Sequence, residues 1–102
     1  MKDLKKWSIK FNALERTENV FWECFYLYEA EEPEEFAEVF LYGKENVILE
    51  FEKIVHEVAL PDYGQEFVSV YLNIYVGEDL IGYFKNIFLL DGTQFDEAFV
   101  IE

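Results

Sequence analysis

Few residues in this chain have side chains suited to nucleophilic catalysis. The only cysteine, Cys24, stands between Glu23 and Phe25, and the only histidine is His56. Negative neighbours and burial both raise the pKa of a thiol, so we expect Cys24 to be an unreactive structural thiol. His56 follows Glu52 by four residues, the spacing of a surface pair on a helix, and no second catalytic group is near it in the sequence. We therefore expect no enzymatic activity.

Metal and phosphate sites have equally little support. There is no cluster of histidines and cysteines that would predict a zinc site. The segment from Asp91 to Glu97 has several acidic residues but lacks the ligand spacing and the closing glutamate of an EF-hand. Acidic pairs for glycoside cleavage are uninformative in a chain with 22 acidic residues. No glycine-rich phosphate loop is present, so the sequence predicts neither a cofactor nor a metal ion.

The strongest chemical signal is the overall charge. In 102 residues, 22 Asp and Glu oppose 8 Lys and Arg, which gives a formal net charge of −14. Beyond residue 10 the only cations are Arg16, Lys44, Lys53 and Lys85, and 21 acidic residues face them. Such a field repels nucleic acids and anionic membranes and attracts basic proteins. We therefore predict a basic protein partner and no binding to nucleic acid or membrane. The alternative is that the acidity only keeps the protein soluble.

The remaining composition is typical of a folded chain. Hydrophobic residues make up 52% of the sequence and aromatic residues 20%, so we expect one folded domain over residues 1–102 rather than disorder. Abundant aromatic residues favour a sheet. A lone cysteine, and N-terminal lysines with no apolar segment after them, indicate a cytoplasmic protein without a signal peptide. No segment is long and apolar enough to predict a transmembrane span.

The N-terminal quarter of the chain predicts a β-hairpin. Residues 7–13 alternate between apolar and polar side chains, as a half-buried strand does. Residues 15–19 (ERTEN) indicate a polar turn, and residues 20–28 (VFWECFYLY) form a nearly continuous apolar run. The two apolar segments are expected to pair as strands, with Cys24 in the middle of the second.

A glutamate-rich run interrupts this predicted sheet. Residues 29–38 (EAEEPEEFAE) contain six glutamates and Pro33. Proline cannot donate to a strand ladder and adjacent carboxylates repel, so the run is expected to be an exposed loop. Residues 36–42 (FAEVFLY) fit either a third strand or the start of a helix, and we favour the strand.

One helix is predicted, in the middle of the chain. Apolar residues between Lys44 and Val58 recur at the spacing of a single helix face: Val47, Phe51, Ile54, Val55 and Val58. Gly43 before this segment and Pro61 after it are typical helix boundaries.

The C-terminal half predicts a strand meander. Residues 66–76 alternate between an aliphatic and an aromatic or polar face, and strands are also expected at 80–90 and 95–101. Turn signals occur at 61–64, 77–79 and 91–93. Together these segments predict an α+β fold in which an antiparallel sheet of five or six strands has one helix packed on its aliphatic face.

The opposite face of that sheet is the predicted binding surface. It is expected to carry Phe67, Tyr71 and Tyr75 from one strand and Trp22 and Tyr26 from another. Tyrosine and tryptophan anchor protein interfaces, and carboxylates around them pair with a partner's Lys or Arg. The alternatives are that these aromatic residues form a second core layer or a dimer seam.

These features resemble the immunity proteins of bacterial toxin systems, including those of contact-dependent growth inhibition. The resemblance lies in the net charge, the glutamate run at 29–38 and the C-terminal stretch YLNIYVGEDLIGYFKNIFLLDGTQFDEAFVIE. It implies that the protein neutralises a cognate toxin, often a basic nuclease, by blocking its active site or an adjacent surface.

Ten residues are the candidates for binding this partner. Charge donors are predicted at Glu31, Glu32, Glu34, Glu35 and Glu38, a second acidic patch at Asp91, Asp96 and Glu97, and aromatic anchors at Tyr71 and Tyr75. The alternative function is a phage-encoded acidic inhibitor that mimics nucleic acid, of the anti-CRISPR or anti-restriction type. We expect a monomer or a weak homodimer.

Overall fold

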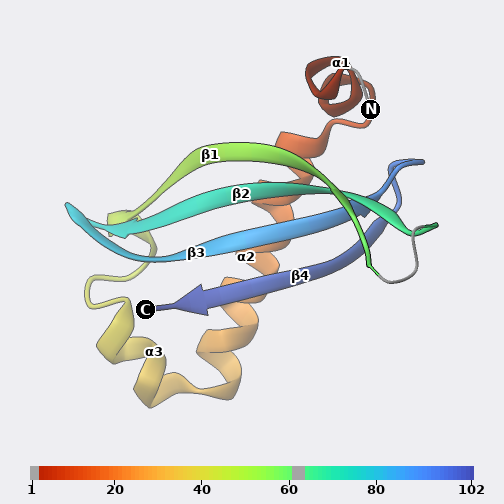
Figure 1. The fold of residues 1–102 in the computed structure, drawn as a ribbon. Coiled ribbons are helices and arrows are strands. Elements are labelled where there is room, and N and C mark those ends of the chain that lie inside the picture. The colour runs from red at the N-terminus through yellow and green to blue at the C-terminus, as the bar shows by residue number, and fades with distance from the viewer. Residues whose placement is uncertain (1–2, 61–63) are drawn as a thin grey trace.

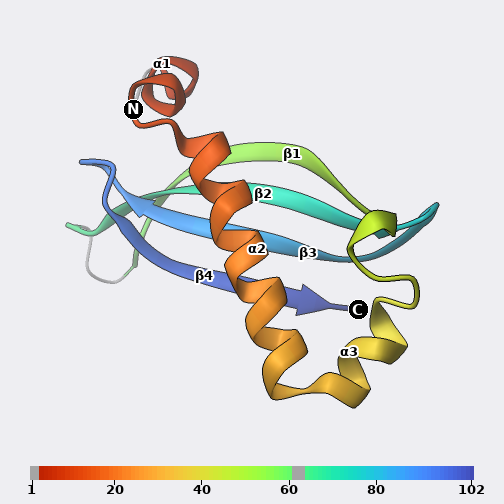
Figure 2. The same cartoon turned by 180° about the vertical axis from the view of Figure 1, so that it is seen from behind.

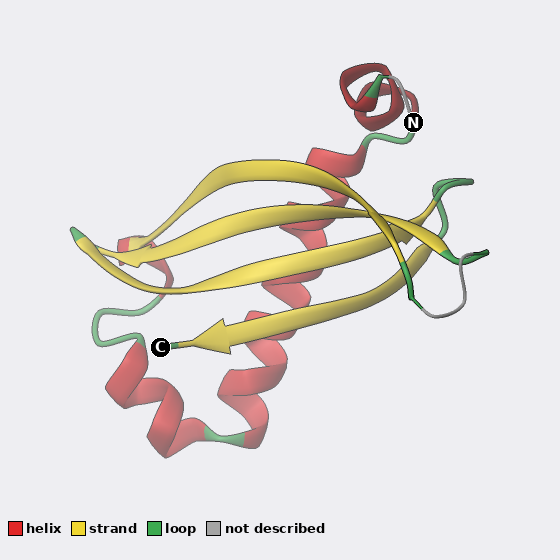
Figure 3. Cartoon of the chain, viewed as in Figure 1, coloured by secondary structure: helices red, strands yellow, loops and turns green. Residues whose placement is uncertain are grey.

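A computed structural model describes residues 3–60 and 64–102, and there the chain forms four antiparallel strands and three α-helices (Figures 1 and 3). The elements in chain order are α1 (Leu4–Lys10), α2 (Ala13–Glu31), α3 (Pro33–Val39), a short 3₁₀ turn (Lys44–Asn46), β1 (Val47–Val58), β2 (Glu66–Val76), β3 (Asp79–Leu89) and β4 (Gln94–Ile101). The strands follow one another in the order β1-β2-β3-β4, so β1 and β4 are the edges of the sheet. The α+β class and the antiparallel sheet are confirmed, whereas five or six strands and one helix were wrong.

The predicted N-terminal hairpin is replaced by α1 and α2. The buried residues of α2 recur every four positions, at Ala13, Thr17, Phe21 and Phe25, which places them on one helix face. In α1, Ile9 is 79% exposed, so the supposed strand alternation does not correspond to burial. The strand propensity of aromatic residues depends on how they pack. Here the burial of one helix face outweighs that propensity.

The glutamates of the run are exposed, as predicted, but the run is mostly helical and not a loop. Residues 29–31 complete α2, Glu32 links the helices, and α3 begins at Pro33. Proline is well tolerated there because the first N–H of a helix has no intrahelical partner. Glu34 and Glu35 in the first turn of α3 are favoured by the positive end of the helix dipole. The strand predicted at 36–42 was therefore also wrong.

The predicted helix at 44–58 is the long edge strand β1. Its register against β2 shifts between Phe51 and Lys53, where the chain has one extra residue. Before this bulge the odd-numbered residues Val47 and Leu49 face the helices. After it the even-numbered Ile54 packs against the core. Two alternating segments offset by one residue produce the spacing that resembles a helix face.

The C-terminal meander is confirmed. Strands β2, β3 and β4 and the turns at 77–79 and 91–93 are present, while the turn at 61–64 lies, apart from Gly64, outside the described residues. The aliphatic side chains of β2 at Val68, Val70, Leu72 and Ile74 are fully buried. The covering helix, however, is α2, which crosses this face of the sheet obliquely (Figure 2).

The core is built between α2 and the sheet. Phe21 packs edge-on against Phe84 of β3, at 5.6 Å between ring centroids, and stacks on Phe99 of β4 at 5.4 Å. At the other end of the sheet Trp7 packs on Phe88 and donates to the carbonyl oxygen of Leu90 at 2.9 Å. No helix in the described part of the chain is long and apolar enough to span a membrane.

Candidate functional site: an acidic groove beside strand β4

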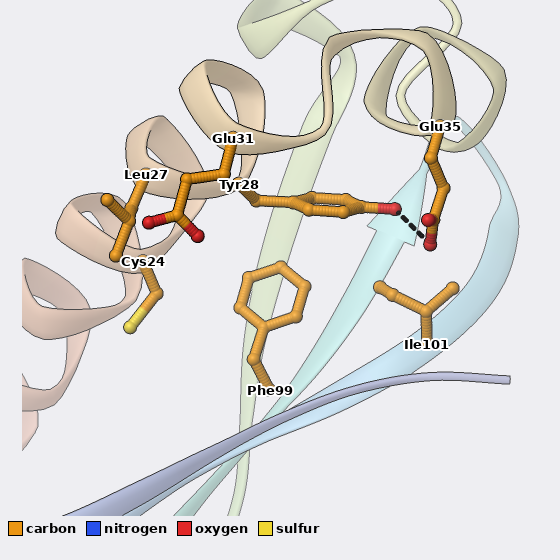
Figure 4. A pocket seen from close by; sticks show the side chains of 7 residues that line it. All are labelled: Cys24, Leu27, Tyr28, Glu31, Glu35, Phe99 and Ile101. Carbon is orange, nitrogen blue, oxygen red and sulfur yellow. Dashed lines mark hydrogen bonds between the residues drawn. The ribbon is translucent and has the colours of Figure 1, made fainter.

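A groove lies between the C-terminal half of α2, helix α3 and strand β4 (Figure 4). Its volume is about 410 Å³. We call it the acidic groove, and it is lined by Cys24, Leu27, Tyr28, Glu31, Glu35, Phe99 and Ile101. Two carboxylates therefore stand beside a mainly apolar lining, which is the composition of a protein-binding surface.

The break between α2 and α3 positions the two carboxylates. Glu31 ends α2, and the link at Glu32 redirects the chain so that Glu35 on α3 faces Tyr28 on α2. The Tyr28 hydroxyl donates a hydrogen bond of 2.8 Å to Glu35 Oε1. Burial, and then this bond to Glu35, raise the pKa of Tyr28 to about 12. Tyr28 is thus a neutral donor at physiological pH and holds the two helices in register.

Part of the apolar lining is held in place by ring contacts. The ring of Phe99 is fixed by Phe21 behind it and by Tyr28, whose ring centroid lies 5.9 Å away. Leu27, by contrast, is 56% exposed. The packed ring of Phe99 can contribute contact area to a partner at little entropic cost, and the exposed Leu27 adds further apolar area.

Cys24 lies in the wall of the groove, on α2 rather than in a strand. Burial raises the pKa of its thiol, with further contributions from Glu97 and Glu23. This is the direction that the sequence predicts. A thiol with a raised pKa carries little thiolate at neutral pH, so it contributes bulk rather than reactivity.

The predicted glutamates divide into two groups around this site. Glu31 and Glu35 line the groove itself. Glu32 and Glu34 are exposed beside it, and Glu38 lines a smaller neighbouring pocket that includes Ile101. The helices therefore keep the predicted charge donors together at one end of the molecule.

The predicted second acidic patch is not one surface. Asp91 accepts a hydrogen bond from the Thr93 amide at 2.9 Å in the β3–β4 turn, which lowers the pKa of Asp91. Asp96 and Glu97 are neighbours in β4 and point to opposite faces of the sheet. Glu97 lies on the helix side, where it acts on Cys24.

Tyr71 and Tyr75 lie on the uncovered face of the sheet, away from the acidic groove. Lys53 and Lys85 both approach the ring of Tyr71, at 4.8 and 5.3 Å from its centroid. The Tyr75 hydroxyl donates to Glu50 Oε1 at 3.4 Å. Both tyrosines are half-buried and already contact charged groups of their own chain. One flat partner surface cannot cover these tyrosines and the glutamate run together.

The sequence predicts Trp22 and Tyr26 on the same face as Tyr71, but the structure does not place them there. They are on α2, where the Lys44 ammonium lies 4.9 Å from the Trp22 ring centroid and 5.4 Å from that of Tyr26. His56 is likewise in β1 and not on a helix, so its partner is Glu66 of β2 at 2.9 Å instead of Glu52.

The sequence prediction missed Leu27, Phe99 and Ile101 as site residues. Each belongs to an apolar run, and an apolar run alone gives no sign that one end of it is accessible.

In the described part of the chain no three His, Cys, Asp or Glu side chains are arranged to hold a metal ion. Comparisons with protein-family models, curated proteins and solved structures gave no match.

Proposed function

We propose that this protein is a cytoplasmic inhibitor that binds a basic protein, as an immunity protein binds its toxin, and that it does not act as an enzyme. The acidic groove is the observation that carries the proposal. Glu31 and Glu35 can pair with Lys or Arg of a partner, while Leu27, Phe99 and Ile101 cover the stems of these side chains or an apolar neighbour. Apolar contacts with charged groups beside them are typical of tight protein interfaces.

The net charge supports the same partner chemistry. A nuclease presents cations to phosphate, so its cationic surface is attracted to a chain with a net charge of −14. Steering of this kind raises association rates towards about 10⁸–10⁹ M⁻¹s⁻¹ at low salt. Fast capture is useful to a cell that must neutralise a toxin it has made or received.

The groove favours this function over mimicry of nucleic acid. A mimic needs rows of carboxylates spaced like phosphates, whereas this groove sets two carboxylates beside Leu27, Phe99 and Ile101. Apolar side chains have no counterpart on a phosphate backbone.

Capture from host lysate, followed by a growth assay, tests the proposal. The bait is compared with Glu31→Gln/Glu35→Gln and with the matched control Glu18→Gln/Glu78→Gln, which removes the same charge from exposed sites outside the groove. We expect the wild type and the control to recover one basic protein that the groove variant recovers poorly. Expression of that protein alone should stop growth, and co-expression with the wild type should restore it.

Equal recovery by the groove variant, or no rescue of growth, would contradict the proposal. Recovery of a nucleoprotein complex from which DNA or RNA displaces the bait would favour the mimic instead.

A further inference from the structure

The sheet ends at β4 before the helical layer does. Strand β4 pairs only with β3, so its other edge is unpaired in the described chain. The C-terminal half of α2 continues past this edge, and α3 lies beyond it (Figure 2). The acidic groove occupies the space between this overhang and β4. A position for one more strand is therefore bounded by helices on one side.

The backbone of β4 has the right polarity to accept a strand. The Glu102 amide donates to the carbonyl oxygen of Ile81 at 2.8 Å, so the even-numbered residues at this end of β4 direct their amides towards β3. The N–H and C=O groups of Phe99 and Ile101 then point outward. The outward N–H of Glu97 already donates to Asp96 Oδ1 at 2.8 Å. The open stretch is thus short and centred on residues 99–101.

The other edge of the sheet is less suited to pairing. Strand β1 is interrupted by its bulge after Phe51, and the exposed side chains around the bulge include the charged Glu52 and Lys53. Bulges and edge charges of this kind oppose the addition of another strand. The register shift that involves β4 falls near its start, opposite Ile87 and Phe88, away from residues 99–101.

We infer that a basic partner docks here as an extended segment that adds a fifth strand beside β4, a refinement that rests on the proposed function. Side chains of this strand that point to the helix side meet Glu31 and Glu35 and the apolar surface of Leu27, so alternate Lys or Arg residues fit. A second copy of this chain fits poorly, because its own β4 would bring Asp96 and Glu97 into an already acidic site.

A short N-acetylated peptide in which arginine alternates with valine is the probe. Two versions carry N-methyl groups, one on the arginine amides and one on the valine amides. Only one set of alternate amides faces β4, so methylation of that set should weaken binding by about tenfold or more and methylation of the other set should not. Loss with the arginine set indicates antiparallel pairing. The amide NMR signals of Phe99 and Ile101 should shift downfield with the unmodified peptide.

The variants separate this inference from the proposed function. Glu31→Gln/Glu35→Gln should weaken the unmodified peptide, and the control Glu18→Gln/Glu78→Gln should not. If both methylated peptides bind equally well but still need Glu31 and Glu35, strand addition is overturned and a basic partner for the groove stands. If the groove variant binds the peptide as the wild type does, both proposals are overturned. Sedimentation as a dimer that the peptide dissociates would assign the edge to a second copy and overturn the inference.

Discussion

At the scale of single residues, side-chain hydrogen bonds connect neighbouring elements of this protein. Tyr28 joins α2 to α3 through Glu35. In the core, Thr17 of α2 donates to the carbonyl oxygen of Ala13 at 2.7 Å and accepts from the Asn86 amide of β3 at 3.3 Å. Each contact has a consequence that a substitution measures.

Replacement of Tyr28 by phenylalanine should lower the free energy of unfolding by about 1 kcal/mol near neutral pH, because one hydrogen bond to a charged acceptor is lost. The pKa of Tyr28 is raised from 10.0 to about 12, so its contribution is fully present below pH 10 and is lost as the pH rises through about 12. The stability difference between wild type and Tyr28→Phe should therefore shrink over this range in chemical denaturation. A difference that stays constant would contradict the assigned bond.

The Thr17–Asn86 pair predicts strong non-additivity. Both side chains are fully buried, and Asn86 Oδ1 has no hydrogen-bond partner within residues 3–60 and 64–102. Thr17→Val should destabilise by about 1–3 kcal/mol because the Asn86 amide is left buried without its acceptor. Thr17→Val/Asn86→Leu should recover most of this loss, as urea denaturation of the two single variants and the double variant will show. Additive losses would mean that the two side chains do not interact.

At the scale of elements, the secondary structure of α2 and of β1 was predicted wrongly for different reasons. In α2 the buried residues from Ala13 to Phe25 are regularly spaced. This spacing is difficult to recognise in the sequence, because neighbouring residues such as Tyr26 and Leu27 are also apolar although they are exposed. In β1 the bulge after Phe51 breaks the two-residue alternation. Neither the exposure of Tyr26 nor the extra residue in β1 is visible without the neighbouring element.

The pairing of β4 with β3 depends on Gly82. A Cβ at this position would overlap the carbonyl oxygen of Val100. Gly82→Ala should therefore push β4 from β3 and cost about 3 kcal/mol of stability, with faster hydrogen exchange of the β4 amides. Gly77→Ala is the matched control. Gly77 has a φ of +61°, but no atom of the residues that the structure describes lies within 4 Å of the added methyl group, so the substitution should cost only about 1 kcal/mol. Unchanged exchange in β4 of Gly82→Ala would contradict this role.

At the scale of the whole molecule, the two sides of the sheet differ in their charged groups and in their shape. The helix side carries the acidic groove and the glutamate run. The uncovered side carries Lys53 and Lys85, two of the four cations beyond residue 10, around Tyr71. A basic partner is therefore expected to approach from the helix side at the end occupied by α3.

Association with that partner should depend on the glutamates as a group. Glu31→Gln/Glu32→Gln/Glu34→Gln/Glu35→Gln should slow association by about tenfold at low salt and flatten its salt dependence, because four charges near the interface are lost. Stopped-flow kinetics with the captured partner measures both effects. Replacement of Glu15, Glu18, Glu45 and Glu78 by glutamine changes the net charge equally at exposed sites outside the groove. If this control slows association as much, net charge rather than the groove is responsible.

Local pattern was sufficient for the acidity, the α+β class and the meander from residue 66 to residue 101. Residues 66–76 alternate between two faces, and the short turns at 77–79 and 91–93 separate the strands, although β3 and β4 each have one register shift. Sequence neighbours also pair in this sheet, so no distant segment had to be known.

Packing was needed for the N-terminal helices, for β1 and for the acidic groove. A run such as residues 20–28 can bury either a strand face or a helix face, and contact with Phe84 and Phe99 selects the helix. The groove exists because α2 extends past the last strand, which places Glu31 and Glu35 beside Phe99 and Ile101. These residues are about seventy positions apart in the chain, and only burial of the core between α2 and the sheet brings them together.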